Sequence, residues 1–305
     1  MGYSFLFPGQ GSQSVGMGKA LYEIFEPARR RIDQVNEIVG RDLVSIMFGG
    51  PMEQLTATEN TQPALFAVEA AIVDVLAENG IVPVVTAGHS LGEYGALYGA
   101  GILSFEDGLS AVAKRGALMA EAGKNSAGTM AAVIGLTGEG LAAALAEVHS
   151  GVVVAANENT PEQTVISGEV AAVKEACEKC KAAGAKRAIV LPVSGAFHSP
   201  LMQGAADAFA EFLEGVSFSE PRCPVISNVS ASAETDPARI KELLLRQLIS
   251  PVKWVDSMNT LVGLEHGTCL ETGPGMVIKG LAKKCIHTLN VVPCDSAMNI
   301  YSLLN

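Results

Sequence analysis

One serine of the sequence has the surroundings of a covalent nucleophile. Ser90 is the central residue of Gly88-His89-Ser90-Leu91-Gly92, the only match to G-x-S-x-G in the chain. A strand-like run (84–88) precedes this motif and an apolar helical run (91–101) follows it, as a nucleophile elbow requires. The glycines allow a sharp turn, and the start of the helix offers the Leu91 N–H to an oxyanion. The alternative is a serine that only caps an ordinary helix.

A serine hydroxyl needs a base to become nucleophilic at neutral pH, and the chain has five histidines. His89 lies inside the elbow and is expected to point away from the nucleophile. His149 ends a predicted helix, and His266 and His287 lie in polar turns. His198 lies in GAFHSP, where a junction between domains could bring it over the elbow. We favour His198 as the base, although spacing alone leaves the other histidines open.

A glycine-rich loop follows the first apolar run of the chain. PGQGSQ (8–13) contains Gln10, and its glycines let backbone N–H groups approach a ligand closely. The loop could therefore supply a second donor to an oxyanion. A simple glycine turn is the alternative.

A predicted helix contains Arg115. Ser104-Phe-Glu-Asp107 has the form of a capping box that begins this helix. The helix has an expected buried stripe, made of Leu109, Val112, Ala113, Gly116, Ala117 and Ala120. Arg115 lies off this stripe, so periodicity alone predicts a solvated side chain.

The elements that must position these residues alternate between strands and helices. Further short β-rich runs occupy 3–7, 223–227, 267–271 and 288–293, and a long helical pattern occupies 63–80. This alternation predicts an α/β fold with a mostly parallel sheet covered on both faces.

One stretch breaks this rhythm. Its predicted order is strand, helix, strand, strand, helix, strand, over 129–136, 138–149, 152–157, 163–168, 169–184 and 186–193, with a loop at ENTPE. This order is that of the ferredoxin-like βαββαβ arrangement. We therefore expect a small subdomain at 127–194, inserted into a large domain formed by 1–126 and 195–305, with a ligand cleft between them.

Composition limits the classes of partner and compartment. The chain has 305 residues and a formal net charge of -11, which argues against nucleic-acid and anionic-membrane binding. It shows no apolar run long enough for a membrane helix and no basic region of a secretory signal. Cys177 and Cys180 have no second close pair, so six scattered cysteines predict no metal site and a reducing, cytoplasmic location.

Several motifs together resemble a known family. They appear in that family's order over essentially the whole chain: PGQGSQ (8–13), GHSLGEY (88–94), KRGALM (114–119), GAFHSP (195–200), RQLISPVKW (246–254) and ETGPG (271–275). The sequence thus resembles the malonyl-CoA:acyl carrier protein transacylases of type II fatty acid synthesis, and more broadly the acyltransferase domains of polyketide synthases. The resemblance implies an α/β-hydrolase-like core with a ferredoxin-like insert.

The resemblance also implies catalytic roles. Ser90 would carry the acyl group, and His198 would act as general base and then as general acid. The backbone N–H groups of Leu91 and Gln10 would form the oxyanion hole. The backbone carbonyl of Gln247 would take the place of a triad aspartate by accepting a hydrogen bond from the histidine.

Further residues would select the substrate. In the family, the arginine at the place of Arg115 pairs with the malonyl carboxylate, which reverses the prediction from periodicity. Phe197 matches the malonyl-type signature. Asn159, with Asn157, matches a polar loop near the site.

The implied reaction is ping-pong transfer of malonyl from malonyl-CoA to the phosphopantetheine thiol of acyl carrier protein. The chain would then need no cofactor or metal of its own, and we expect a monomer. Because the carrier protein is acidic, docking would need a local basic patch, for which Lys186, Arg187, Lys279, Lys283 and Lys284 are candidates.

Three other functions remain open. A serine esterase or thioesterase would use the same elbow, although no acid residue stands clearly before a late histidine. An acyltransferase that serves a polyketide synthase in trans would carry the same residues. A carrier-binding scaffold with an inactive site is the third alternative, which the intact set of Ser90, His198 and Arg115 disfavours.

Overall fold

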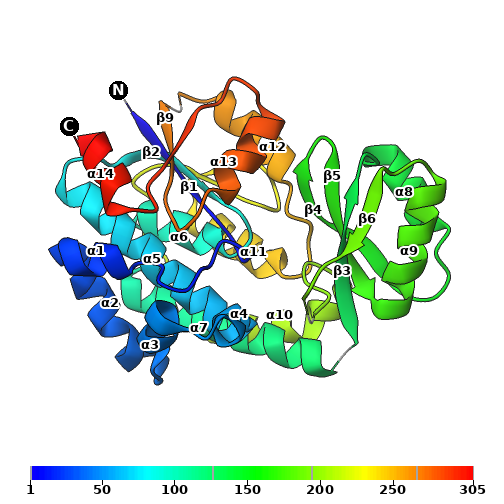
Figure 1. The fold of residues 1–305 in the computed structure, drawn as a ribbon, viewed down its shortest axis with the longest axis horizontal. Helices are drawn as coiled ribbons and strands as arrows, with labels where there is room; N and C mark the ends of the chain where they lie inside the picture. Colours follow the sequence, from blue (N-terminus) through cyan, green and yellow to red (C-terminus); the bar gives the residue numbers. More distant parts are fainter. Residues whose placement is uncertain (1, 126, 194, 266, 305) are drawn as a thin grey trace.

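The computed structural model describes residues 2–125, 127–193, 195–265 and 267–304, and they form a larger and a smaller α/β part (Figure 1). The elements of the larger part before the insertion are β1 (Tyr3–Phe7), α1 (Lys19–Ile24), α2 (Glu26–Val39), α3 (Leu43–Gly49), α4 (Met52–Thr56), α5 (Thr58–Glu78), β2 (Pro83–Gly88), α6 (Gly92–Gly99) and α7 (Phe105–Asn125). Those after it are the 3-10 helix η1 (Pro200–Met202), α10 (Gln203–Glu214), β7 (Val225–Ile226), β8 (Ala233–Glu234), α11 (Pro237–Gln247), α12 (Trp254–Val262), β9 (Thr268–Glu271), α13 (Val277–Cys285), β10 (Val291–Pro293) and α14 (Ala297–Leu304).

The sheet of the larger part has the order β10-β9-β1-β2-β7-β8 in the described residues. Every neighbouring pair is parallel except β7 and β8. Phe5 and Phe7 of β1 pack into the core on one face of this sheet, and Leu6 packs into the core on the other. This alternation buries β1 on both faces, which agrees with the predicted, mostly parallel, doubly covered sheet.

The carboxyl ends of β1 and β2 lie side by side, because Phe7 pairs with Gly88 in the parallel register. The PGQGSQ loop leaves β1 and the elbow leaves β2 at this same edge. Two loops that are about 80 residues apart in sequence therefore meet where ligands bind in open α/β sheets.

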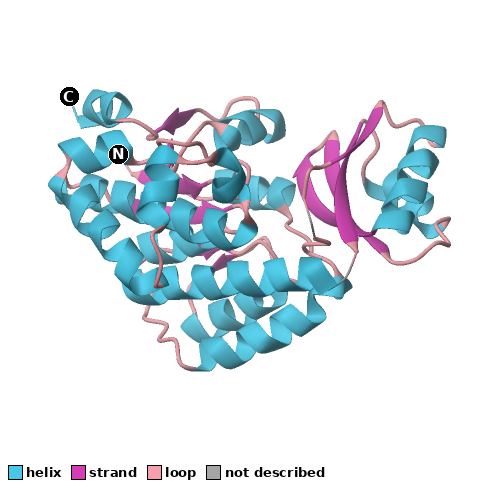
Figure 2. Cartoon of the chain, turned by 60° about the horizontal axis from the view of Figure 1, so that its bottom comes forward, coloured by secondary structure: helices cyan, strands magenta, loops and turns pink. Residues whose placement is uncertain are grey.

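The smaller part contains β3 (Gly128–Ile134), α8 (Gly138–Ala146), β4 (Val153–Thr160), β5 (Gln163–Glu169), α9 (Val170–Ala182) and β6 (Arg187–Val190). Its sheet has the order β4-β5-β3-β6 and is antiparallel throughout. Both helices cover the sheet face that points away from the larger part (Figure 2). The element order predicted for this stretch is the one observed.

The two parts are joined by backbone hydrogen bonds as well as by the chain. Val252 of the larger part donates its N–H to Ala156 O, and its own carbonyl accepts from Glu158 N, both at 2.9 Å. The end of β4 is thereby fixed against the segment that precedes α12. The expected domain boundaries at residues 126 and 194 lie outside the described residues.

Some predicted bounds differ from the structure. ENTPE is not a loop: β4 continues to Thr160, and Pro161 and Glu162 alone form the turn to β5. The helix predicted from residue 63 begins at Thr58, with Pro63 inside its first turns. Residues 19–56, for which no element is predicted above, form α1 to α4.

The six cysteines all lie within the described residues, and none of them forms a disulfide. Five are buried and Cys285 is half-buried. Burial raises the pKa of each thiol, for example to about 11 at Cys180 and, with the nearby Asp295 and Glu271, to about 12 at Cys294. Within the described part of the chain, no helix is both long and apolar enough to cross a membrane.

Candidate active site

Ser90 lies on a sharp turn between β2 and α6. Its φ of 53° falls in the left-handed region, where a residue with a side chain is strained. A side chain at Gly88 would collide with the backbone of Gly92, and one at Gly92 with the backbone of Phe7 and Pro8. The glycines of the motif are therefore required by close backbone packing, as the sequence predicts.

Asn228 holds this turn from the loop after β7. Its Oδ1 accepts a hydrogen bond from Ser90 N at 2.7 Å, and its Nδ2 donates to Gly88 O at 2.6 Å. Asn228 is fully buried, so these bonds have no competition from water. The strained conformation of Ser90 is thus fixed by a residue more than 130 positions away in sequence.

His198 faces the serine. The distance from Ser90 Oγ to His198 Nε2 is 2.7 Å, and that from His198 Nδ1 to Gln247 O is 2.9 Å. A carbonyl only accepts, so Nδ1 carries the proton and Nε2 is left to accept from the serine hydroxyl. Burial, with a smaller contribution from the charge of Arg115, lowers the pKa of His198 to about 3. The imidazole is therefore neutral at physiological pH and can act as a base.

Arg115 is buried, with a relative exposure of 1%. Its Nη1 donates to Gln62 Oε1 at 2.8 Å, and its Nη2 donates to Gln247 Oε1 at 2.9 Å and to Ser90 Oγ at 3.3 Å. The prediction from periodicity, a solvated arginine, is wrong. Its partners come from α5 and α11, which the pattern of α7 alone cannot reveal, and Ala117 of the expected buried stripe is exposed instead.

The partners of Arg115 are amide and hydroxyl oxygens rather than carboxylates, and its Nε has no partner among the described residues. Burial lowers the pKa of the guanidinium, while Tyr94 and Glu93 raise it. The guanidinium also lies over the ring of Tyr94, 5.6 Å from its centroid. The site therefore holds a buried cation that lacks a direct anionic partner, beside the hydroxyl of Ser90.

The side chain of Gln247 connects three of these groups. Besides accepting from Arg115, it donates from Nε2 to Ser90 O at 2.9 Å and to Glu93 Oε2 at 2.6 Å. The family resemblance implies a role only for the backbone carbonyl of Gln247, not for this side chain. Burial raises the pKa of Glu93 to about 7, and the hydrogen bond from Gln247 opposes this shift.

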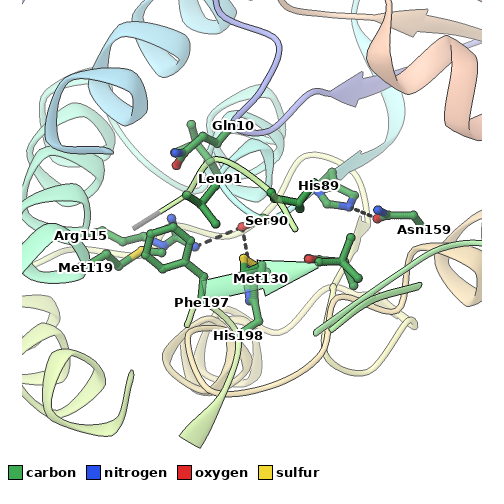
Figure 3. Close-up of a pocket in the computed structure, with 14 residues that line it drawn as sticks. Gln10, His89, Ser90, Leu91, Arg115, Met119, Met130, Asn159, Phe197 and His198 are labelled. Carbon is green, nitrogen blue, oxygen red and sulfur yellow. Dashed lines mark hydrogen bonds between the residues drawn. The ribbon is translucent and has the colours of Figure 1, made fainter. Parts of the chain in front are cut away.

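A cavity of about 190 Å³ opens over Ser90. Gln10, Leu91, Phe197 and Asn159, all singled out from the sequence, line it together with Ser90, His198 and Arg115, and its apolar wall includes Met119, Met130, Val165, Leu191 and Val193. Figure 3 shows Arg115, Met119 and Phe197 on one side of Ser90, and His89 and Asn159 on the other. A second cavity, of about 470 Å³, shares Gln10, Leu191 and Val193 with the first.

His89 points toward the smaller part, as Figure 3 shows. Its Nε2 lies 2.8 Å from Asn159 Oδ1, and its ring packs edge-on to Trp254. Burial lowers its pKa, and the bond to Asn159 raises it. His149 and His287 are exposed, and His266 lies outside the described residues.

The sequence reasoning missed four residues of the site: Gln62, Glu93, Tyr94 and Asn228. Glu93 and Tyr94 belong to the GHSLGEY motif, so their position in the motif was an available signal. Nothing in the local sequence distinguishes Gln62 or Asn228. No cluster of three or more His, Cys, Asp or Glu side chains that could hold a metal ion occurs in the described ranges.

Several known proteins are similar to this chain in sequence and in fold. A family model described as acyl transferase domain matches residues 4–297. The malonyl CoA-acyl carrier protein transacylase of Bacillus subtilis (strain 168) is 47% identical over 291 residues, which cover 95% of this chain and 92% of that protein. The protein of the same name from Escherichia coli (strain K12) is 42% identical over 301 residues, covering 97% and 96%.

Solved structures of proteins with similar sequences also have a similar fold. An acyl carrier protein S-malonyltransferase from Vibrio cholerae superposes with a TM-score of 0.95 at 42% identity, covering 99% of this chain and all of that one. A malonyl-transacylase solved in complex with a holo type II polyketide synthase acyl carrier protein gives a TM-score of 0.96 at 40% identity, covering 100% and 99%.

Proposed function

The chain belongs to the acyl transferase domain family, and we propose that it transfers malonyl from malonyl-CoA to the phosphopantetheine thiol of acyl carrier protein, supplying fatty acid synthesis. The observation that carries this proposal is the buried Arg115, whose Nη2 lies 3.3 Å from Ser90 Oγ. A cation at this distance from the nucleophile can pair with the free carboxylate of a malonyl group on that serine.

We propose that Ser90 and His198 perform the first half-reaction as a dyad. His198 Nε2 takes the hydroxyl proton while Ser90 Oγ attacks the thioester carbonyl. The tetrahedral oxyanion lies at the N–H groups of Leu91 and Gln10. Its collapse expels the CoA thiolate, which takes the proton from the imidazolium and leaves a malonyl ester on Ser90. The carbonyl oxygen of Gln247 accepts the hydrogen bond from His198 Nδ1–H throughout, so this proton stays on Nδ1.

The second half-reaction repeats these steps with the carrier's thiol. His198 takes the thiol proton, the sulfur attacks the ester carbonyl, and the oxyanion forms at the same N–H groups. Ser90 leaves as an alkoxide and regains the proton from His198. Because the pantetheine arm belongs to the carrier protein, the chain itself contributes only side chains and backbone N–H groups.

Mass spectrometry of the protein after exposure to malonyl-CoA tests this proposal. Wild type should gain one malonyl group, and Ser90→Ala should gain none, because it lacks the oxygen that forms the ester. Malonylation of the Ser90→Ala variant at wild-type extent would overturn the assignment of the nucleophile.

Two other functions use the same dyad. A hydrolase would release malonate from the ester to water, so the ratio of free malonate to malonyl carrier protein distinguishes it from a transferase. Service to a polyketide synthase is favoured by one observation, the relative solved with a type II polyketide synthase carrier protein. Rates with fatty-acid and polyketide carrier proteins would decide between the pathways.

We propose that the carrier protein docks on basic side chains of the surface. Lys186, Arg187, Lys283 and Lys284 are exposed, and Lys279 is half-buried. We propose that they contact the acidic carrier. Charge reversal at these positions should raise the KM for carrier protein and leave that for malonyl-CoA unchanged. An unaltered KM for carrier protein would reject this patch.

We further propose the finer architecture implied by the sequence. The parallel sheet and its helices form an α/β-hydrolase-like core, and residues 127–194 form a ferredoxin-like subdomain, which the strand order β4-β5-β3-β6 supports. We also propose a monomer and a reducing cytoplasm, and the cysteines without disulfides support the second of these. Light scattering of the protein in solution would test whether it is a monomer.

A further inference from the structure

The amide of Gln247 can satisfy its neighbours in only one orientation. Its Oε1 accepts from Arg115 Nη2, and its Nε2 donates to Glu93 Oε2 and to Ser90 O. Turning the amide over would place an NH₂ group against the guanidinium and a carbonyl oxygen against two other oxygens. Gln247 is fully buried, so water cannot replace the lost partners.

Glu93 is the strongest acceptor among these neighbours. It lies in the first turn of α6, is 2% exposed, and its two oxygens also accept from Asn228 N at 3.4 Å each. The hydrogen bond from Gln247 Nε2 favours the ionised form of Glu93 against the effect of burial, and an ionised carboxylate only accepts, so the NH₂ group of Gln247 lies on its side. The carbonyl oxygen of Gln247 is thereby directed to Arg115, which has no carboxylate among its hydrogen-bond partners in the described residues.

We propose that Glu93 is a positioning residue for malonyl selectivity: by accepting from Gln247 Nε2, it directs Gln247 Oε1 to Arg115 and so aims the guanidinium at the carboxylate of the acyl group. The chain of contacts runs from Glu93 through Gln247 to Arg115 and ends 3.3 Å from Ser90 Oγ. This inference rests on the proposed malonyl transfer.

An acetyl group has no carboxylate for the guanidinium to bind. Loss of the Glu93 acceptor should therefore reduce malonyl loading of Ser90 and spare acetyl loading. A residue that only supported the elbow would affect both acyl groups alike, because both use the same serine, histidine and oxyanion donors.

Competition between malonyl-CoA and acetyl-CoA for Ser90, read by mass spectrometry of the acyl-enzyme, tests the proposal. Glu93→Met removes the acceptor at similar size, and we expect the malonyl-to-acetyl ratio to fall about tenfold or more, the scale of a hydrogen bond to a charged group. Glu93→Gln retains one acceptor oxygen, and we expect its ratio to stay within about threefold of wild type.

Glu69→Met is the matched control. Glu69 is also a fully buried glutamate, but it lies on α5 and lines neither of the two cavities described above. Its replacement should leave the ratio unchanged. If Glu93→Met does not fold, Glu93→Asp carries the test, because it keeps the charge but withdraws the acceptor by one methylene; we expect its ratio to fall severalfold.

Three results would overturn the proposal: an unchanged ratio in Glu93→Met or in Glu93→Asp, equal losses of malonyl and acetyl loading, or a Glu93→Gln ratio as low as that of Glu93→Met. The malonyl-to-acetyl ratio of the wild type distinguishes failure of this proposal from failure of the proposed function. A wild type that does not prefer malonyl contradicts the function itself, whereas a selective wild type with insensitive variants contradicts only the role of Glu93.

Discussion

At the scale of single residues, Arg115 and His198 are buried in the same site, so the positive charge of the guanidinium affects the pKa of the imidazole. The guanidinium lowers the pKa of the imidazole further than burial alone does. It thus favours the neutral imidazole and, in the proposed mechanism, also offers the cation that pairs with a malonyl carboxylate. The proposal therefore places selection of the acyl group and activation of the nucleophile together at the hydroxyl of Ser90.

Arg115→Ala should separate these two functions. Malonyl loading should fall about a hundredfold or more, since a buried charge pair with a carboxylate is lost. Acetyl loading should fall much less. Rates of loading of Ser90 with each CoA ester measure this difference. Equal losses would mean that Arg115 supports the structure alone.

The pH dependence of acetyl loading should reveal the low pKa of His198. A group with a pKa of about 3 stays neutral above about pH 5, so the loading rate should not show a loss with a midpoint near the ordinary value of 6.5. In Arg115→Ala the pKa should rise, because a positive charge is removed, and the acid limb should move to higher pH. A midpoint near 6.5 in wild type would contradict this environment. Acetyl-CoA is the suitable substrate because it does not use the carboxylate clamp.

The sequence predicts the site residues unevenly, for a physical reason. Ser90 is identified by its neighbours in the chain, since the elbow is a local structure. His198 could be favoured but not fixed by spacing, and periodicity misassigned Arg115. A period of 3.6 residues reports which face of a helix is apolar, and it contains no information on polar partners from α5 and α11. Asn228 and Gln62 act only through such distant contacts.

At the scale of elements, the elbow depends on the loop after β7. Asn228 bridges Ser90 N and Gly88 O on either side of the strained residue. Ser90 lies two residues before α6, outside the hydrogen bonds of the helix, and its left-handed conformation is held by this link. The turn is therefore stabilised by a loop that comes more than 130 residues later in the chain and follows β7, the neighbour of β2 in the sheet.

Asn228→Ala should destabilise the protein by about 1–3 kcal/mol, since two buried backbone groups lose their partners. It should also slow malonyl and acetyl loading by similar factors, in contrast with Arg115→Ala. Urea unfolding and the two loading rates are the measurements. Selective loss of malonyl loading would be inconsistent with a role in the elbow.

Elements with strong periodicity were predicted well, and short elements were predicted unevenly. The βαββαβ order of the smaller part follows from clear alternation between apolar strands and amphipathic helices. β7 has two residues and lies within the run predicted at 223–227, whereas β8, also of two residues, is too short to show a period and was not predicted. ENTPE was assigned to a loop from its polar composition, yet pairing with β5 extends β4 through it. Tertiary pairing overrides local propensity in such segments.

At the scale of the whole molecule, one buried carboxyl limits stability. Glu69 is fully buried, and neither of its oxygens has a hydrogen-bond partner among the described residues. Burial raises its pKa well above the ordinary 4.5, so the folded protein keeps a proton that the unfolded chain releases. Stability from this group is present below pH 4.5 and is lost as the pH rises toward the folded-state pKa.

Glu69→Met should therefore raise the free energy of unfolding at pH 8, by about 1–3 kcal/mol if the buried polar group is uncompensated. The gain should be smaller at pH 5, where the Glu69 carboxyl of the unmutated protein is closer to fully protonated in both the folded and the unfolded chain. Urea denaturation at the two pH values provides the comparison. An equal gain in the free energy of unfolding at both pH values would show that Glu69 is not protonated in the folded protein.

The assembly of the two parts could be expected only in outline. The break in the alternation of strands and helices indicated an insertion, and the presence of two domains indicated a ligand cleft between them. The contacts that set the cleft, such as the bond between His89 and Asn159, join residues 70 positions apart. Their partners become apparent only when both sheets are in place.

The buried cysteines have a consequence for an enzyme whose substrates and products are thiols. Released CoA and the carrier's pantetheine arm can exchange with accessible thiolates or form mixed disulfides with them. With raised pKa values, the protein's own sulfurs stay protonated, and all but the half-buried Cys285 are shielded. The proposed acyl ester on Ser90 would then pass to a sulfur from outside with little thiolate inside the chain to compete for it.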